Sequence, residues 1–125
     1  MKIYNHKYME FILNEDRIDF IWTANSEDMS DDEFQFCILR YASFAMEYKI
    51  KNVLIDLTDF KFKPAEESGQ FHSDFVTKIY NMIGVTKKVF VAPFMENEII
   101  GKEPGTDYDN AFMKTYKEAV DWLNS

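Results

Sequence analysis

The sequence predicts a single α/β domain, residues 1–125, with a mixed sheet of about five strands. Short apolar runs alternate with longer segments of helical periodicity, which is the pattern of successive βα units. Before the first of these units stand two strand-like runs joined by a short polar turn, which favours an antiparallel hairpin at the N-terminus.

The hairpin is formed by residues 8–15, YMEFILNE, and residues 17–24, RIDFIWTA. Asn14, Glu15 and Asp16 supply the polar turn between them. The second run alternates in polarity, so that one face carries Ile18, Phe20 and Trp22 and the other carries Asp19, Ile21 and Thr23. This alternation is typical of a strand with one buried face.

The first helix is expected from Asp31 to Lys49. Ser30 followed by Glu33 forms a capping box, and acidic residues in the first turn suit the positive end of the helix dipole. Apolar residues recur at helical spacing: Phe34, Ile38, Tyr41, Ala45 and Tyr48.

The next βα unit begins with NVLIDLTDF, residues 52–60, whose apolar run predicts a parallel strand buried on both faces. A helix follows, with Pro64 in its first turn and Gly84 at its C-cap. We expect its buried stripe to consist of Phe71, Phe75, Ile79 and Met82.

The last third of the chain contains another parallel strand, KKVFVAP, residues 87–93, followed by an irregular segment or short helical turn at 94–105. Residues 107–114 have two interpretations, an edge strand or part of one long C-terminal helix. Thr115 with Glu118 three residues on is a second capping box, which favours a strand followed by a separate helix.

Composition excludes several classes of partner. With 22 acidic and 14 basic residues the formal net charge is −8, so we expect neither nucleic acid nor an anionic membrane surface as a partner. The sequence shows no signal peptide and no apolar run long enough to insert in a membrane. Cys37 is the only cysteine, which fits a reducing compartment, and we expect a cytoplasmic protein.

Candidate catalytic residues are few. Asp56 and Asp59 lie at a strand end, where metal or base roles are common, but no third ligand accompanies them, and turn hydrogen bonds explain them as well. His72 and Asp74 are two residues apart on a helix and point in different directions. Cys37 falls among core positions. We therefore expect no catalytic site, metal or cofactor, and an enzyme using Asp56, Asp59 or His72 is the third hypothesis.

Ser68 and Gly69 interrupt the second helix with two small residues. One interpretation is an exposed serine that accepts a phosphate near the helix N-terminus. The other is close packing, with the Ser68 hydroxyl bonded to a carbonyl one turn back. We expect four residues of predicted loops to border a small apolar pocket or a partner surface: Phe60 and Phe62 before the second helix, and Phe94 and Met95 after the next strand.

Three segments carry a family resemblance: KNVLIDLTDFKF at 51–62, GVTKKVFVAP at 84–93 and FMKTYKEAVDWL at 112–123. Together they resemble the bacterial SpoIIAA-like family, the STAS and anti-sigma-factor-antagonist group. The resemblance covers nearly the whole chain, and its most specific part is the C-terminal helix with Ala119, Trp122 and Leu123. The same fold class includes the lipid-carrying CRAL-TRIO domains.

The resemblance implies a non-catalytic regulatory or protein-interaction module. Its partner surface would consist of Thr58, Asp59, Phe60, Phe62 and Ser68, and Ser68 would be the phosphorylated serine, about two residues later than in the antagonists. The alternative function is binding of a small apolar ligand or lipid, which the aromatic content and the CRAL-TRIO kinship favour. The residues name neither the protein partner nor the ligand.

Overall fold

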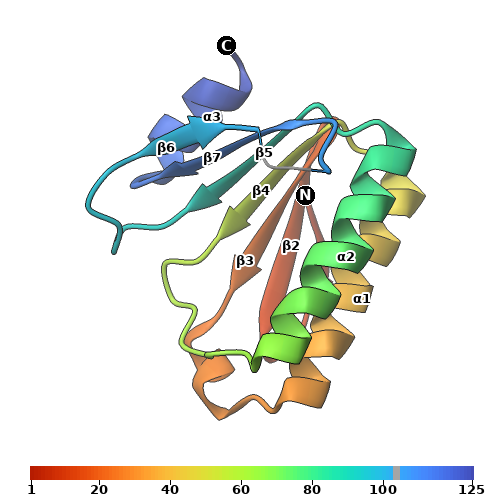
Figure 1. The fold of residues 1–125 in the computed structure, drawn as a ribbon, viewed down its shortest axis with the longest axis vertical. Coiled ribbons are helices and arrows are strands. Elements are labelled where there is room, and N and C mark those ends of the chain that lie inside the picture. The colour runs from red at the N-terminus through yellow and green to blue at the C-terminus, as the bar shows by residue number, and fades with distance from the viewer. Residues whose placement is uncertain (103–104) are drawn as a thin grey trace.

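Seven strands form one mixed sheet in the computed structural model, which describes residues 1–102 and 105–125 (Figure 1). The strands are β1 Lys2–Asn5, β2 Met9–Asn14, β3 Arg17–Trp22, β4 Asn52–Asp56, β5 Lys87–Val91, β6 Ile99–Gly101 and β7 Asp109–Met113. Their order in the sheet is β1-β2-β3-β4-β5-β7-β6. The central strands β3, β4, β5 and β7 are parallel, and the pairs β1–β2, β2–β3 and β6–β7 are antiparallel.

The helices cover the two faces of the sheet unequally (Figure 1). On one face α1, Asp31–Tyr48, and α2, Glu66–Ile83, lie side by side, and a short 3-10 helix, η1, Ala24–Asp28, leads into α1. On the other face α3, Tyr116–Leu123, packs against β4, β5 and β7. None of the helices that the structure describes combines the length and apolar character needed to cross a membrane.

Caps confirm the predicted starts of α1 and α3 and the predicted end of α2. The predicted place of Pro64 in the first turn of α2 is wrong, because α2 begins at Glu66 with Ala65 as its N-cap. The hydroxyl of Ser30 accepts the backbone N–H of Glu33 at 3.2 Å, and the Glu33 carboxylate accepts the backbone N–H of Ser30 at 3.0 Å. Gly84 follows α2 in the left-handed conformation, with φ of 81°, which a glycine adopts without strain. Thr115 caps α3 and accepts the backbone N–H of Glu118 at 3.1 Å.

The predicted number of about five strands is wrong, because two edge strands lack the alternation of apolar and polar residues that marks a strand. β1 precedes the predicted hairpin, and β6 lies in the segment 94–105 that was expected to be irregular. Both are short, and neither contains a buried residue, so neither shows the alternation that marks a strand. Residues 107–114 contain the strand β7, but β6 pairs outside it, so β7 is internal and not the expected edge.

The predicted buried stripe of α2 is also wrong in its register. The buried residues are Ser68, Val76 and Tyr80, whereas Met82 is 63% exposed. Phe71 and Phe75 are half-buried and stack on each other with ring centroids 5.5 Å apart. The reason is that α2 packs along α1, and its buried Val76 and Tyr80 belong to the core cluster that lies beneath the two helices.

The core is divided by the sheet into two parts. The larger part lies between the sheet and the pair α1–α2 and is rich in aromatic rings, including Phe11, Phe20, Trp22 and Phe34. The smaller part lies under α3 and consists of Leu54, Val89, Val91, Ala111, Met113, Ala119 and Leu123. β4 contributes to both, as predicted for a strand buried on both faces: Val53 and Ile55 on one side, Leu54 on the other.

Candidate functional site

The loop between β4 and α2 contains most of the predicted site residues. At its start the Asp56 carboxylate accepts the backbone N–H of Thr58 at 2.9 Å and its hydroxyl at 2.5 Å. These bonds give Asp56 the turn-forming role, and Asp59 is exposed beyond it. Among residues 1–102 and 105–125, no three His, Cys, Asp or Glu side chains are grouped so that they hold a metal ion.

Backbone hydrogen bonds fix this loop to the start of α1. The N–H of Lys61 donates to the buried Ser26 hydroxyl at 2.9 Å, and the N–H of Ala65 donates to the Asp31 carboxylate at 2.9 Å. The fixed backbone turns the rings of Phe60 and Phe62 inward, where both pack against the core. Phe60 contacts Trp22 with ring centroids 4.7 Å apart.

The five residues of the expected partner surface therefore separate into two groups. Thr58 and Asp59 are exposed, whereas Phe60 and Phe62 are half-buried and pack in the aromatic core. Ser68 is only 2% exposed. The structure does not bring these five residues together on one surface.

The Ser68 hydroxyl is enclosed between the two long helices. It accepts a hydrogen bond from the side-chain amide of Gln35 in α1 at 3.2 Å. Ser68 is thus buried, as the packing interpretation expects, but its partner lies on α1 and not one turn back in α2. A Cβ added to Gly69 would meet no atom within 4 Å, so close packing does not explain that glycine.

A hollow of about 180 Å³ lies beneath the loop and is named here the apolar hollow. Its walls come from β3, β4, β5, both long helices and the loop itself: Trp22, Phe34, Tyr41, Ile55, Leu57, Phe60, Pro64, His72 and Phe90. All of these except His72 are apolar or aromatic. The hollow lies at the carboxyl end of β4, where open α/β sheets commonly bind their ligands.

A second hollow of about 180 Å³, named here the polar hollow, adjoins the first. It is lined by His72, Ser73, Val76, Thr77, Lys88, Phe90 and Phe112. His72 and Phe90 line both hollows, so these two side chains lie between the two spaces. Lys88 is 5% exposed, and its ammonium lies 5.0 Å from the centre of the Phe90 ring.

His72 separates the two hollows and is electrostatically unusual. Burial, assisted by the nearby charge of Lys88, lowers the pKa of its imidazole to about 4, so the ring is neutral at pH 7. A neutral imidazole offers one donor and one acceptor. Within the described part of the chain, no residue forms a hydrogen bond with this ring, although Tyr41 meets it edge-on at 5.9 Å.

The sequence pattern indicates His72 only as a catalytic candidate and does not mark Trp22 or Lys88 as site residues. One signal was present in KKVFVAP, residues 87–93. Strand alternation puts Lys88 on the same face as Phe90, and a lysine inside a buried parallel strand is uncommon.

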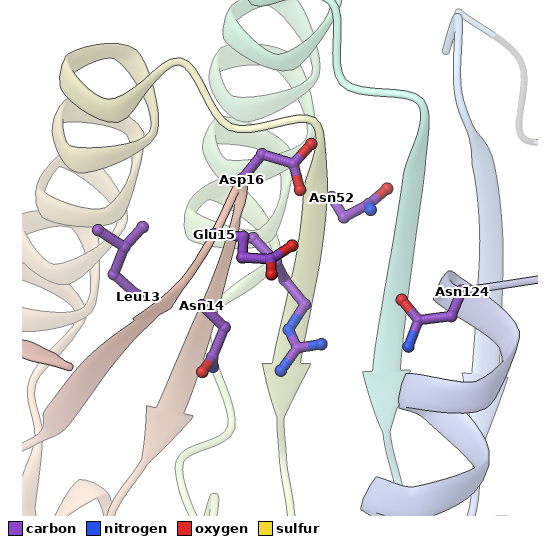
Figure 2. Close-up of a pocket in the computed structure, with 7 residues that line it drawn as sticks. Leu13, Asn14, Glu15, Asp16, Asn52 and Asn124 are labelled. Atoms are coloured by element: carbon purple, nitrogen blue, oxygen red, sulfur yellow. The ribbon is translucent and has the colours of Figure 1, made fainter.

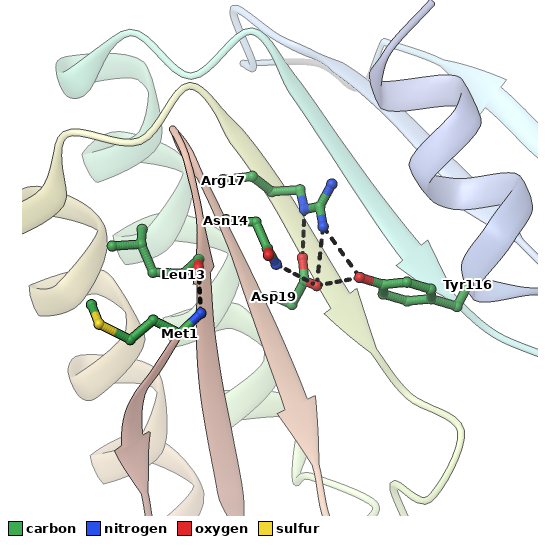
Figure 3. Close-up of polar contacts among 6 residues, drawn as sticks. All are labelled: Met1, Leu13, Asn14, Arg17, Asp19 and Tyr116. Carbon is green, nitrogen blue, oxygen red and sulfur yellow. Dashed lines mark hydrogen bonds and ion pairs between the residues drawn. The ribbon is translucent and has the colours of Figure 1, made fainter.

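The opposite face of the sheet carries a buried carboxylate, Asp19, which is 1% exposed (Figure 3). Arg17 donates to it from Nε at 2.7 Å and from Nη2 at 3.3 Å, and the Asn14 side-chain amide donates at 3.2 Å. The hydroxyl of Tyr116 in α3 donates at 2.7 Å. Burial, followed by the bond to Asp19, raises the pKa of Tyr116. These contacts tie α3 to the N-terminal hairpin.

A larger pocket of about 490 Å³ lies beside this network (Figure 2). It is lined by Leu13, Asn14, Glu15, Asp16, Arg17, Asn52 and Asn124. Its place at the amino ends of β3 and β4 is opposite to the usual ligand position in parallel sheets. Arg17 and Asn14 already donate hydrogen bonds to Asp19, so the strongest donors of this pocket are used within the fold.

Comparison with protein-family models, with curated proteins and with solved structures gives no match to this chain.

Proposed function

We propose that this chain is a non-catalytic binding module that holds a small apolar molecule, or the apolar part of one, in the apolar hollow. The observation that carries the proposal is the lining of that hollow, in which eight apolar or aromatic side chains and His72 line about 180 Å³ of partly open space. Dry cavities of about 150 Å³ with such walls accommodate a benzene ring. The hollow therefore suits one aromatic ring or a short alkyl chain.

The tethered loop supports the same function. Leu57, Phe60 and Pro64 form the loop side of the hollow, and the bonds from Lys61 to Ser26 and from Ala65 to Asp31 hold that side in place. A site that is formed before its ligand arrives loses little conformational entropy on binding.

Fluorescence of Trp22 tests this proposal, because its indole lines the hollow. In a Trp122→Phe background Trp22 is the only tryptophan of the chain. Titration with toluene or n-octanol should give a saturable change in emission. Leu57→Phe should weaken binding by about tenfold or more, since a larger side chain occupies the hollow.

Leu39→Phe is the matched control, because Leu39 is 45% exposed on α1 and lines none of these hollows. It should leave the affinity unchanged. The proposal is wrong if no apolar compound gives a saturable response and if native mass spectrometry of the purified protein finds no bound small molecule.

A second candidate function is a protein-interaction module of the SpoIIAA-like type. It is supported by the N-terminal hairpin followed by βα units, and by Thr58 and Asp59, which are exposed on a loop of fixed conformation. Under this candidate, Asp59→Lys should abolish capture of a specific partner in a pull-down, with Asp74→Lys on α2 as the exposed control. Unchanged capture by the Asp59 variant would reject this surface.

Phosphorylation of Ser68 belongs to this second candidate. Because Ser68 is buried against Gln35, a phosphate there requires α2 to move away from α1. Ser68→Asp should therefore destabilise the fold, whereas Ser68→Ala should be nearly neutral. Equal thermal stability of the two variants would mean that the hydroxyl is accessible to a kinase.

A further inference from the structure

We propose that β6 pairs with the β6 strand of a second copy of this chain, antiparallel about a twofold axis at Ile100, so that the two sheets continue as one. This contact goes beyond the binding function proposed above, because it uses the edge of the sheet and not the apolar hollow.

The first argument is the open edge that β6 forms at one end of the sheet (Figure 1). Its outer side pairs with no strand that the structure describes, so that side offers backbone N–H and C=O groups to another strand. Ile99 and Ile100 are each more than half exposed, one on each face of the strand. An exposed apolar edge of this kind favours the addition of a further strand.

The strand at the other end of the sheet, β1, has features that oppose such pairing. Its ladder with β2 is irregular between Lys2 and Tyr4, and the Lys2 ammonium forms an ion pair with Glu10 at 2.9 Å. Irregular pairing and a lysine are two means by which proteins protect an edge strand. Of the two edges, β6 is therefore the one that is open to a second copy.

The second argument is charge complementarity, because the segment 98–102, EIIGK, is complementary to itself. With Ile100 opposite Ile100 of the second copy, Glu98 of each copy lies opposite Lys102 of the other. Opposite charges across an antiparallel pair stabilise it. Both side chains are exposed, and Lys102 forms no ion pair with a residue that the structure describes. A shift of the register by two residues puts Glu98 or Lys102 opposite Ile100 and loses both ion pairs.

The surroundings of Glu98 favour a further positive charge. Its carboxyl group lies beside that of Glu118 in α3, and the hydrogen bond between the two raises the pKa of Glu98. The nearby charge of Lys114 acts in the opposite direction, but one ammonium offsets only one of two carboxylates. Lys102 of the second copy supplies the other positive charge.

The third argument is the space above Gly101. Ile99 and Gly101 share the face of the sheet that carries Phe112. On this face lies a hollow of about 160 Å³, which is lined by Ile99, Gly101, Lys102, Asn110 and Phe112. A Cβ added to Gly101 would meet no atom within 4 Å. In the proposed register Ile99 of the second copy lies opposite Gly101, so its side chain fills this space, and the twofold axis repeats the contact.

The dimer should be weak, because strands of three residues bury less than the 800 Å² or so on each partner that a stable interface needs. We expect a dissociation constant between about 10 μM and 1 mM. Sedimentation velocity over this range of protein concentration measures it. A protein that stays monomeric at about 1 mM would overturn the inference and leave the edge to a strand of a different protein.

Charge reversals test the register. Glu98→Lys and Lys102→Glu should each weaken self-association by about tenfold or more, because like charges then face each other twice. An equimolar mixture of the two variants should dimerise about as tightly as wild type, since each facing pair is again of opposite charge. Lys78→Glu is the matched control, because it makes the same change of charge at an exposed position of α2 and should leave the dimer unchanged.

Two results would contradict the proposed pairing. One is a mixture of the folded charge variants that associates no more tightly than either variant alone. The other is an unchanged dimer of Ile100→Lys, which puts two like charges at the twofold axis and, because Ile100 is exposed, should leave the fold intact. In that case the copies would meet at a different surface.

Discussion

Asp19 and His72 are two polar side chains held on opposite faces of the same sheet, and their surroundings differ in kind. Asp19 receives hydrogen bonds from Arg17, Asn14 and Tyr116, so its burial is compensated within the chain. His72 has only ring contacts and lies between two hollows. The comparison teaches that a buried polar group with a complete set of partners maintains the fold, whereas one that faces open space is available to a ligand.

The largest expected effect is on the complete network. Asp19→Ala removes the acceptor of four hydrogen bonds and leaves Arg17, whose side chain is 14% exposed, without its counter-charge. We expect the free energy of unfolding in urea to fall by about 3–5 kcal/mol. A loss below about 1 kcal/mol would mean that water replaces the hydrogen bonds of Asp19. Asp19 would then not be a polar group that maintains the fold, and it would not differ from His72 in this respect.

Ile55→Ala tests the aliphatic wall of the apolar hollow. Ile55 is 1% exposed in β4, so its truncation should cost about 2–5 kcal/mol through lost transfer energy and an enlarged cavity. Urea denaturation measures the loss, and the Trp22 titration should show that larger apolar ligands now bind. A cost below 1 kcal/mol would place Ile55 outside the core.

Tyr116→Phe removes one contact of the Asp19 network and leaves the others. The expected loss is about 1 kcal/mol, below that of a fully buried bond to a charge, because Tyr116 is 45% exposed. Since the pKa of Tyr116 is raised in the folded protein, its contribution is complete below pH 10 and is lost as the pH rises above it. Thermal melts at pH 8 and at high pH should therefore converge for wild type and variant, and parallel curves would contradict this role.

His72→Phe should have the smallest effect at pH 7, within about 1 kcal/mol, because no hydrogen bond to a described residue is lost. Stability measurements between pH 6.5 and pH 4 distinguish wild type from the His72→Phe variant. The folded-state pKa of about 4 lies below the ordinary 6.5, so the folded protein binds this proton less readily than the unfolded chain. Wild type should lose stability relative to His72→Phe as the pH falls from 6.5 toward 4, and an unchanged difference would show that His72 is accessible to water.

Local signals in the sequence predict most of the secondary structure. The capping box of Ser30 and Glu33 fixes the start of α1, and the Thr115 side-chain cap fixes the start of α3, because their bonds join residues three apart. Thr115 and Glu118 do not form the reciprocal box, since the Glu118 carboxylate accepts from the Thr115 hydroxyl. The short edge strands β1 and β6 give no such signal. They form by backbone pairing with β2 and β7, and not by burying side chains.

The site is less predictable because it depends on contacts between distant residues. Tyr116 and Asp19 are 97 residues apart in the sequence, and no local pattern joins them. Burial of Ser68 is one of the two alternatives that the sequence allows, but the expected bond to a carbonyl one turn back is wrong. Its partner Gln35 follows only from the packing of α2 on α1. The loop residues Phe60 and Phe62 were expected near a pocket or surface, and they prove to be packed in the aromatic core, with Phe60 lining the apolar hollow.

The most direct test of the account is an NMR pH titration of the His72 imidazole, which lines the apolar hollow. The chain has two histidines, so a His6→Gln variant assigns the resonances. We predict a midpoint of about 4, because burial and the nearby charge of Lys88 both disfavour the imidazolium. A midpoint at or above 6.5 would contradict the claim that His72 is shielded from water and neutral at pH 7.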